Sequence, residues 1–311
     1  MRIGIDIGGM SVKGGIVSND GVILHKHVIK TKPGDVSKSI ASDLASLIDL
    51  LLVNANVKAS DITACGIGSP GAIDPINGVI KYSNNIVMKN VRIRGELSKL
   101  YPFPVSVDND ANCAALGEAK FGGGRGAEDV IFITLGTGVG SGIIVGGKLF
   151  TGGGGAGAEA GHTVIKVGGE KCNCGRRGCW ERYASATALV RQTKAAMLKN
   201  PGSAMHAEAA RDNKVSGRTA FLAAARGDKA GQKVVDTYLN YIAAGILNLA
   251  NVFRPQLAVI GGGVSNEGPA LLAPIQARLD KELFGGEINP PVKVVLAKLG
   301  NDAGILGAAF L

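Results

Sequence analysis

The chain lacks any long run of apolar residues and any leader of the secretory type. Met1 is followed directly by the alternating apolar residues Ile3, Ile5 and Ile7, with no basic stretch before them. No segment approaches the ~18 consecutive apolar residues that a membrane-spanning helix needs. These absences predict a cytoplasmic protein that is neither secreted nor held in a membrane.

Clustered positive charge is also scarce, although the formal net charge is +9. Lys and Arg are dispersed, and the one local group is Lys171, Arg176 and Arg177. No basic helix occurs, and basic residues do not alternate with aromatic ones, so nucleic acid is not an expected partner. A dispersed positive surface with a mild preference for anionic ligands such as nucleotides fits better.

Glycine, in contrast, is abundant, with 47 residues where an ordinary share is ~7%. The glycines cluster in the ranges 8–15, 122–126, 136–157 and 261–263. Such clusters indicate places where the backbone approaches other groups closely, rather than a flexible linker. The length of 311 residues suggests two domains. We expect a smaller α/β domain at 1–121, joined by a C-terminal helix at 300–311, and a larger α/β domain at 122–299.

Hydrophobic spacing predicts a similar order of elements in both halves of the chain. The first half has strands at 2–7, 12–17 and from Val22, a helix from about Asp35, and strands at 62–68 and 104–107. The pattern of strand, glycine turn and strand in GIDIGGMSVKGGIV returns in ITLGTGVGSGIIV, which indicates an internal duplication. Two such halves facing across a cleft would hold a nucleotide between them. The later elements are expected as helices at about 184–199, 217–226, 229–252 and 268–284, a strand at 292–296, and a short buried last helix capped by Asp302.

Three glycine turns follow buried strands and are candidates for nucleotide binding. In the first, DIGG, the backbone amides can approach phosphates, Asp6 can hold Mg2+ and Lys13 can offset phosphate charge. The second, LGTGVGSG, lacks the GK[ST] ending of a Walker A loop, and the third, VIGGG, offers a flat backbone to a purine ring. An ordinary turn or a structural hairpin remains the alternative for each turn taken alone. The nucleotide candidates from these turns are Asp6, Gly8, Gly9, Lys13, Gly136, Thr137, Gly138, Gly261, Gly262 and Gly263.

One histidine and three cysteines lie close together in EAGHTVIKVGGEKCNCGRRGCWE, with a glutamate near each end. His162, Cys172, Cys174 and Cys179 make a Cys3His set, which suits a tetrahedral structural zinc ion. A disulfide or unpaired core thiols are the alternative, but three cysteines within eight residues are an odd number for pairing. A full ligand shell leaves no place for a catalytic water, so the zinc would hold a loop rigid. Cys65 and Cys113 are expected to be small buried apolar residues.

Short polar side chains elsewhere suit a sugar. VDNDAN at 107–112 precedes a helical pattern, so Asp110 is expected at or near a helix N-terminus, where it can serve as a cap and also as a general base. Neutral amides and carboxylates that accept hydrogen bonds from several hydroxyls are what a sugar ring needs. Such a set is completed by GSPGAID at 68–74, by Asn84 and Asn85, and by the acids beside the cysteines. Each Asn taken singly, however, is typical of a turn.

These motifs together resemble the ROK family of sugar kinases, and within it the bacterial ATP-dependent glucokinases. The resemblance covers essentially the whole chain through DIGG, GSPG, NN, NDANCAALGE, LGTGVGSG, ExGH, CxCGxxGCxE and the late GGG. It implies an actin-like ATPase (ribonuclease H-like) fold with two α/β domains around a deep cleft. Met10 stands where the family usually has Thr or Ser, with Ser11 as a possible substitute for the hydroxyl, and Met88 stands where an aromatic residue often follows NN. The residues that the resemblance implies for sugar binding are Gly71, Asn85, Asn109, Asp110, Glu159, His162 and Glu181.

The function expected from this resemblance is transfer of a phosphoryl group from ATP, with Mg2+, to the 6-hydroxyl of D-glucose, with Asp110 as the base. A kinase for N-acetylmannosamine, N-acetylglucosamine or fructose is the alternative. The same set of hydroxyl-binding residues can distinguish these sugars only through the shape of the pocket. A sugar-responsive repressor is less expected, because the sequence opens on the first strand with no room for a DNA-binding module. A non-catalytic sugar-binding or chaperone-like ATPase is a third possibility. A homodimer is implied by the resemblance alone.

Overall fold

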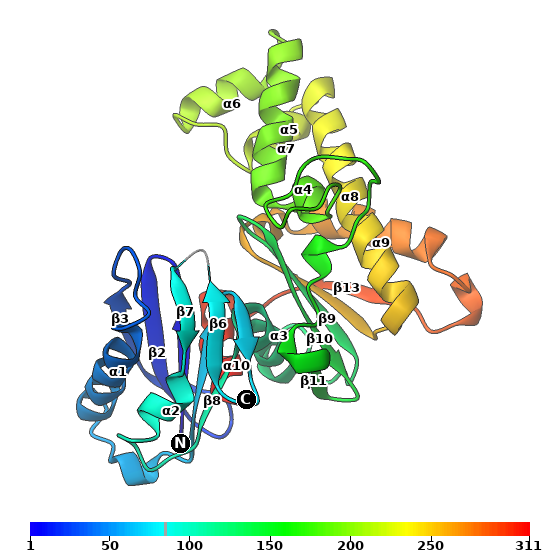
Figure 1. Ribbon diagram of the computed structural model, residues 1–311. Helices are drawn as coiled ribbons and strands as arrows, with labels where there is room; N and C mark the ends of the chain where they lie inside the picture. Colours follow the sequence, from blue (N-terminus) through cyan, green and yellow to red (C-terminus); the bar gives the residue numbers. More distant parts are fainter. Residues whose placement is uncertain (84–85) are drawn as a thin grey trace. The chain divides into compact units, whose positions relative to one another are not determined.

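The computed structural model describes residues 1–83 and 86–311 (Figure 1). Its framework is a pair of five-stranded sheets, with a smaller three-stranded sheet between β4 and β8 in the chain. The strands of the first sheet are β1 (Arg2–Ile7), β2 (Ser11–Val17), β3 (Ile23–Lys30), β4 (Ala64–Ser69) and β8 (Val105–Asn109). Those of the second are β9 (Val130–Leu135), β10 (Val139–Val145), β11 (Lys148–Phe150), β12 (Leu257–Gly261) and β13 (Lys293–Leu296). The small sheet holds β5 (Ala72–Asp74), β6 (Val79–Ser83) and β7 (Met88–Val91).

The two large sheets have the same strand order, which confirms the predicted repeat. The order is β3-β2-β1-β4-β8 in the first and β11-β10-β9-β12-β13 in the second. In the first, β2 is antiparallel to β1 and to β3, while β4 lies parallel to β1 and to β8. In the second, β12 is likewise parallel to β9 and to β13. Parallel strands are buried on both faces, which explains the nearly continuous burial of β9 and of Ile3 to Ile5 in β1.

By its contacts, the chain divides into two compact units. Unit 1 comprises 1–128, 142–158 and 298–311, and unit 2 comprises 129–141 and 159–297. The segment 142–158 thus groups with unit 1, whereas the sequence analysis assigned it to the second domain. The expected boundary near residue 121 stays a prediction.

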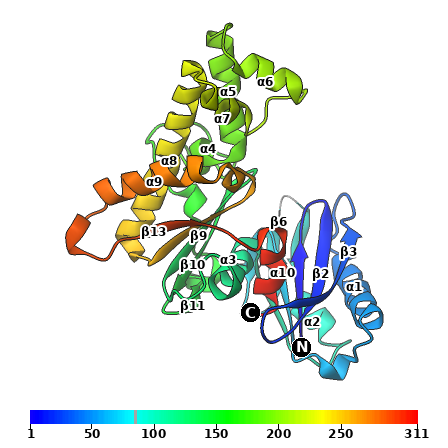
Figure 2. The same cartoon turned by 180° about the vertical axis from the view of Figure 1, so that it is seen from behind.

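Unit 1 brings its last helix close to the backbone of the strands β1 and β4 and of one other helix, and glycine makes this possible. The helices are α1 (Ile40–Asn54), α2 (Ile93–Leu97), α3 (Asp110–Phe121) and α10 (Ala303–Ala308). A Cβ on Gly66 of β4 would stand 1.7 Å from the Ala308 carbonyl, and one on Gly307 would stand 1.6 Å from the Cys113 carbonyl. Figure 2 shows α10, in red, beside α3. The last helix is therefore buried as predicted, although Asp302 makes no capping hydrogen bond and pairs with Lys26 instead.

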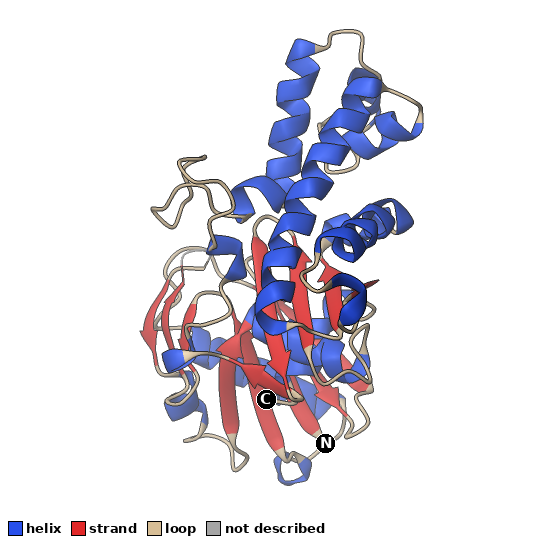
Figure 3. Cartoon of the chain, turned by 90° about the vertical axis from the view of Figure 1, so that its right-hand side faces the viewer, coloured by secondary structure: helices blue, strands red, loops and turns tan. Residues whose placement is uncertain are grey.

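Unit 2 carries most of the helical residues, and a long segment of little regular structure, which starts in unit 1, leads into its first helix. The helices are α4 (Glu181–Ala184), α5 (Ala186–Lys199), α6 (Met205–Arg211), α7 (Thr219–Ala225), α8 (Lys229–Phe253) and α9 (Pro269–Glu282). Between β11 and α4, the regular structure is limited to the 3-10 turns η2 (Gly153–Gly155) and η3 (Ala160–His162), so much of this segment is drawn as tan loop in Figure 3. Ser185, whose hydroxyl accepts from the Ala188 amide, caps α5 and divides the single helix predicted at 184–199.

The sequence analysis misplaced one helix start and missed several short elements. The helix predicted from about Asp35 begins at Ile40, because the Asp35 carboxylate accepts from the Ser37 amide and the Val36 amide donates to the Val87 carbonyl. Strands β5 to β7 and helices α2 and α6 were not predicted, since they are short. Over the described ranges, no helix combines the length and the apolar character that crossing a membrane requires.

Candidate active site

The predicted residues of unit 1 gather where three parallel strands end. β1 leads into the first glycine turn, β4 leads into the GSPG segment, and β8 leads directly into α3. Because carboxyl ends of neighbouring parallel strands meet at one edge of a sheet, these three segments are neighbours. The register pairs Asp6 of β1 with Gly68 of β4, and Ser69 of β4 with Asn109 of β8.

Asp110 is the first residue of α3, as the sequence predicted, but the residue that caps the helix is Asn109. The Asn109 side-chain oxygen accepts from the Ala111 amide at 2.8 Å and from the Asn112 amide at 3.3 Å. Its amide nitrogen donates to the Gly71 carbonyl at 3.3 Å, which ties the GSPG segment to the start of α3. The Asp110 carboxylate itself accepts from the Ala111 amide at 2.9 Å. A carboxylate at this helix end is stabilised as the anion, which is the form that a general base needs.

The Asp6 carboxylate lies close enough to Asp110 for their negative charges to repel each other. This makes Asp6 the unit 1 residue best suited to bind a cation. Burial raises the pKa of Asp6, Lys13 at 3.9 Å opposes that shift, and the negative charge of Asp110 adds to it. A divalent cation here would be favoured, because it would relieve both the burial of one carboxylate and the repulsion between two. The donor set therefore fits the predicted Mg2+.

The first glycine turn is a tight loop between β1 and β2. The Gly8 amide donates to the Ser11 carbonyl at 2.9 Å, which leaves Gly9 and Met10 at the tip. A Cβ on Gly9 would meet nothing within 4 Å, and the Met10 side chain is 90% exposed. The open space at Gly9 is what a phosphate would need for close approach to the backbone. Met88, the other departure from the family pattern, is a buried core residue of β7.

The second and third glycine turns are adjacent in unit 2, at the ends of the parallel strands β9 and β12. Gly262 has a φ of +84°, and a Cβ there would stand 2.5 Å from the Leu135 carbonyl, just before Gly136. A Cβ on Gly136 or on Gly263 would meet nothing within 4 Å. The structure thus brings together the two turns that the sequence assigned to phosphate and to adenosine.

His162, Cys172, Cys174 and Cys179 form one cluster in unit 2, and its geometry suits zinc. The four ligand atoms lie within 4.8 Å of one another, with 3.7 Å between Cys172 Sγ and His162 Nδ1 and 3.6 Å between Cys174 Sγ and Cys179 Sγ. Tetrahedral zinc with bonds of about 2.0–2.3 Å spaces its ligand atoms about 3.5–3.8 Å apart. All five cysteines of the chain are free, and Cys65 and Cys113 are fully buried as predicted. The residues therefore fit a structural zinc ion.

The thiols of this cluster differ in how readily they ionise. Burial raises the pKa of Cys179 to about 12, whereas a hydrogen bond from the Arg176 backbone lowers the pKa of Cys174. A bound metal requires thiolates, so its binding must displace protons from the more buried thiol.

Glu181 links the cysteine cluster to the second glycine turn, a connection that the sequence did not reveal. One carboxylate oxygen accepts from the Val139 amide at 3.2 Å, and the other lies 3.9 Å from Cys172 Sγ. A Cβ on Gly138 would stand 2.3 Å from the Glu181 carboxylate, so this glycine leaves space for it. Glu159, the other predicted acid, has an exposed side chain. Asn85, a predicted sugar ligand, lies outside the described residues.

Two buried acids of unit 1 were missed by the sequence analysis. Asp108 accepts from the Asn109 amide at 2.6 Å and from the Asn112 side chain at 2.8 Å, and burial raises its pKa. Glu118, with no exposed surface, accepts from the amides of Gly123, Lys298 and Leu299. Asp108 is the next-to-last residue of β8 and Glu118 lies in α3. Their partners are set by the packing of these elements, so no local sequence signal separates them from ordinary surface charges.

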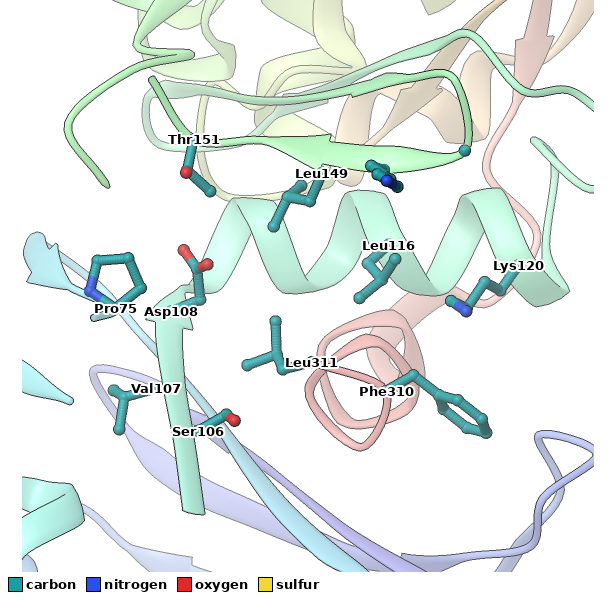
Figure 4. A pocket seen from close by; sticks show the side chains of 12 residues that line it. Pro75, Ser106, Val107, Asp108, Leu116, Lys120, Leu149, Thr151, Phe310 and Leu311 are labelled. Carbon is teal, nitrogen blue, oxygen red and sulfur yellow. The ribbon is translucent and has the colours of Figure 1, made fainter. Parts of the chain in front are cut away.

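A pocket of about 400 Å³ lies along α3 in unit 1. Figure 4 shows Asp108 at the end of β8, just before the helix, and Lys120 near the end of the helix. The apolar side chains of Leu116, Leu149 and Leu311 lie between them. None of the site residues predicted from the sequence lines this pocket, but its Asp108 directly precedes Asn109 of the candidate site.

Comparison with known proteins places these features in a family. A glucokinase of Streptomyces coelicolor is 38% identical over 317 residues, covering 100% of this chain and 97% of the relative. A glucokinase of Thermotoga maritima is 36% identical, covering 99% of this chain and 96% of the relative. The crystal structure of a ROK family glucokinase from Streptomyces griseus in complex with glucose and AMPPNP has a TM-score of 0.81 and 36% identity, over 99% of this chain and 98% of that one.

The fold agrees with these similarities. The repeated five-stranded sheets are those of the actin-like ATPase fold of the ROK sugar kinases, as the resemblance implied. The pattern of the ROK family matches residues 2–311. The chain belongs to the ROK family.

Proposed function

We propose that the protein is an ATP-dependent glucokinase, which transfers the γ-phosphoryl group of ATP to the 6-hydroxyl of D-glucose. The observation that carries this proposal is the position of Asp110, at the start of α3 and directly after the capping Asn109, in a chain similar over its full length to glucokinases. A carboxylate there can accept the proton of the hydroxyl as it attacks phosphorus in line.

The residues of each unit would divide the work. In unit 1, Asn109 orients the start of α3 through its bonds to Ala111 and Gly71, so that Asp110 meets the attacking hydroxyl in a defined direction. In unit 2, carboxylates would accept hydrogen bonds from the other hydroxyls, and an imidazole nitrogen would accept from them or donate to them. The sugar ligands proposed are Gly71, Asn85, Asn109, Glu159, His162 and Glu181.

The three glycine turns would bind the nucleotide through their backbone. The amides of the first and second turns suit phosphate oxygens, and the third turn suits the adenosine. Mg2+ would be held with ATP near Asp6, with Lys13 beside it, and neutralises charge on the phosphates when bound. Ser11 stands at the start of β2, where it can offer the hydroxyl that Met10 lacks.

Zinc would serve as a structural clip. The cluster lies in a segment where Gly175 and Gly178 have φ values of +92° and +82° and where regular structure is scarce. A bound ion would order this segment and thereby orient His162 and Glu181. The activity is therefore expected to need Mg2+ in the assay and zinc in the protein, for different reasons.

The experiment that tests this function is a coupled phosphorylation assay with ATP across glucose, fructose, N-acetylglucosamine and N-acetylmannosamine. We expect the largest kcat/KM for glucose. A higher value for another sugar would move the assignment to that sugar, while leaving the kinase class in place. If the protein binds a sugar but phosphorylates none of the four, the result would instead support a regulator.

We further propose a cytoplasmic location, a homodimeric state and a role at the entry of glucose into glycolysis. Cysteines held as reduced metal ligands suit a reducing compartment. Light scattering on the purified protein would measure the mass in solution, and a monomeric mass would contradict the dimer.

A further inference from the structure

The two phosphate turns share one structural device. In each, a threonine hydroxyl from another part of the same unit donates to a carbonyl of the turn. We propose that Thr31 and Thr187 are positioning residues, which aim one backbone amide of each turn at the phosphates of the nucleotide. This inference rests on the proposed function, because it takes both turns as phosphate sites.

In the first turn, Thr31 holds the carbonyls on both sides of Gly9. The Thr31 hydroxyl donates to the Gly8 carbonyl at 2.6 Å, and the Thr31 amide donates to the Met10 carbonyl at 3.2 Å. In a trans peptide the carbonyl and the following amide point in opposite directions. Drawing the Gly8 carbonyl toward Thr31 therefore turns the Gly9 N–H away from Thr31. The backbone at this tip is open, because a Cβ on Gly9 would meet nothing within 4 Å.

In the second turn, α5 supplies the same restraint. The Thr187 hydroxyl donates to the Thr137 carbonyl at 2.8 Å, and the Ala186 amide donates to the Gly136 carbonyl at 2.8 Å. By the same peptide geometry, the amides of Thr137 and Gly138 point the other way. Neither amide donates a hydrogen bond to any residue within the described ranges. They are available to an external acceptor.

The chemistry that such amides recognise is a phosphate oxygen. Peptide amides held in advance bind an anion without having to reorient, so the binding free energy is not reduced by ordering the turn. Met10 cannot help in the first turn, because its side chain is 90% exposed and has no hydroxyl. Besides the Gly8–Ser11 backbone bond, the order of that turn therefore depends on Thr31, which follows β3 directly.

Thr31→Val and Thr187→Val test the proposal, because valine keeps the shape of threonine and removes the donor. We expect each change to raise the Kd for Mg2+–AMPPNP, measured by calorimetry, about fivefold to tenfold. The KM for ATP should rise in parallel, while the KM for glucose stays within about twofold. Thr31→Ser and Thr187→Ser keep the hydroxyl and should restore nucleotide affinity.

Two threonines outside the turns provide matched controls. Thr63 donates through its hydroxyl and its amide to the Met1 carbonyl, at 3.0 and 2.8 Å, as Thr31 does to its turn. Thr237 donates to the Lys233 carbonyl at 2.8 Å in α8. Thr63→Val and Thr237→Val lose comparable hydrogen bonds, so they should leave nucleotide affinity within about twofold of the wild type.

The outcomes separate this inference from the proposed function. Unchanged nucleotide affinity in folded valine variants, or no recovery with serine, overturns the positioning role even if the wild type phosphorylates glucose. A wild type that binds AMPPNP but phosphorylates no sugar refutes the kinase assignment, while the comparison of Kd values still decides the role of the threonines. Failure of the wild type to bind AMPPNP overturns both. Should a valine variant unfold, the alanine variant makes the same comparison.

Discussion

The two five-stranded sheets have one strand order but carry different chemistry at their carboxyl ends. In unit 1, acids belong to the strands and helix themselves, with Asp6 in β1 and Asp110 at the start of α3. In unit 2, the ends of β9 and β12 lead into glycine turns, and Glu181 is supplied from outside the sheet. The repeat therefore has the same backbone arrangement in both copies, while the carboxylate proposed as the base, Asp110, occurs in one of them.

The two units also differ in how the acids proposed for the site are held. Asp110 is oriented by a helix, a cap and a bond to its neighbouring amide. Glu181 depends on a short helix, one hydrogen bond to Val139 and the cysteine cluster next to it. The first arrangement is complete within the polypeptide, whereas the second is expected to need a metal ion.

The largest effect is expected at Asp110. Asp110→Asn should lower kcat about 10²-fold to 10⁴-fold, because the amide cannot take the proton, while glucose affinity changes little. Asp49→Asn is the matched control in unit 1, since Asp49 lies in α1 and its carboxylate accepts from the Tyr101 hydroxyl at 2.7 Å. A near-normal kcat in Asp110→Asn would contradict the role of Asp110 as the base, and with it the proposed chemical difference between the two units.

The next effect concerns the metal in unit 2. The purified protein should hold about one zinc ion per chain, and Cys174→Ser should lower zinc content and raise the Kd for glucose about tenfold or more. Cys65→Ala, which changes a thiol of unit 1 outside the cluster, should keep the zinc. Metal analysis by mass spectrometry and calorimetry with glucose provide the readouts. An active protein free of zinc would contradict the clip.

A smaller effect distinguishes the two acids that flank the cysteines. Glu181→Gln should weaken glucose binding and also raise the KM for ATP severalfold, because Glu181 bonds to Val139 of the second glycine turn. Glu159→Gln should weaken glucose binding alone, since the Glu159 side chain is exposed. Steady-state kinetics with both substrates varied would measure this. Equal effects of the two variants on ATP would rule out a link through Glu181.

The smallest effect is on stability, at Asp108. Burial raises the pKa of Asp108 in the folded protein, so its ionised form costs stability that is recovered as the pH falls through that raised pKa. Asp108→Asn should therefore increase the free energy of unfolding at pH 7 by about 1 kcal/mol. The difference should shrink as the pH falls through the raised pKa and be lost below the ordinary pKa of 3.8. Urea unfolding at several pH values measures it. If the variant were less stable than the wild type at pH 7, the Asp108 charge would instead be stabilising the protein through its hydrogen bond from the Asn112 side chain.

The sequence predicted the repeated framework well, because long buried strands and glycine turns leave a periodic pattern. It also located the ligand cluster, since Cys172, Cys174 and Cys179 are close along the chain. The small sheet and α6 escaped prediction because elements of three to seven residues carry too little periodicity. The helix near Asp35 was extended too far, since the side-chain turn at Ser37 competes with helix formation there.

Long-range hydrogen bonds were beyond sequence reasoning. The Thr31 hydroxyl reaches Gly8, and Thr187 reaches Thr137, across separations that no local pattern encodes. The bond from Val139 to Glu181 is of the same kind, and it changes what Glu181 is expected to do. These contacts depend on how strands and helices pack, so they become visible only in three dimensions.

The central claim is that this chain moves a phosphoryl group to a sugar hydroxyl and not to water. The most direct measurement is to quantify ADP and glucose 6-phosphate in one sample of wild-type protein incubated with glucose, ATP and Mg2+. The account predicts equal amounts of the two products, and little ADP when glucose is left out. ADP formed without glucose 6-phosphate would contradict it, because that result describes an ATPase and not a glucokinase.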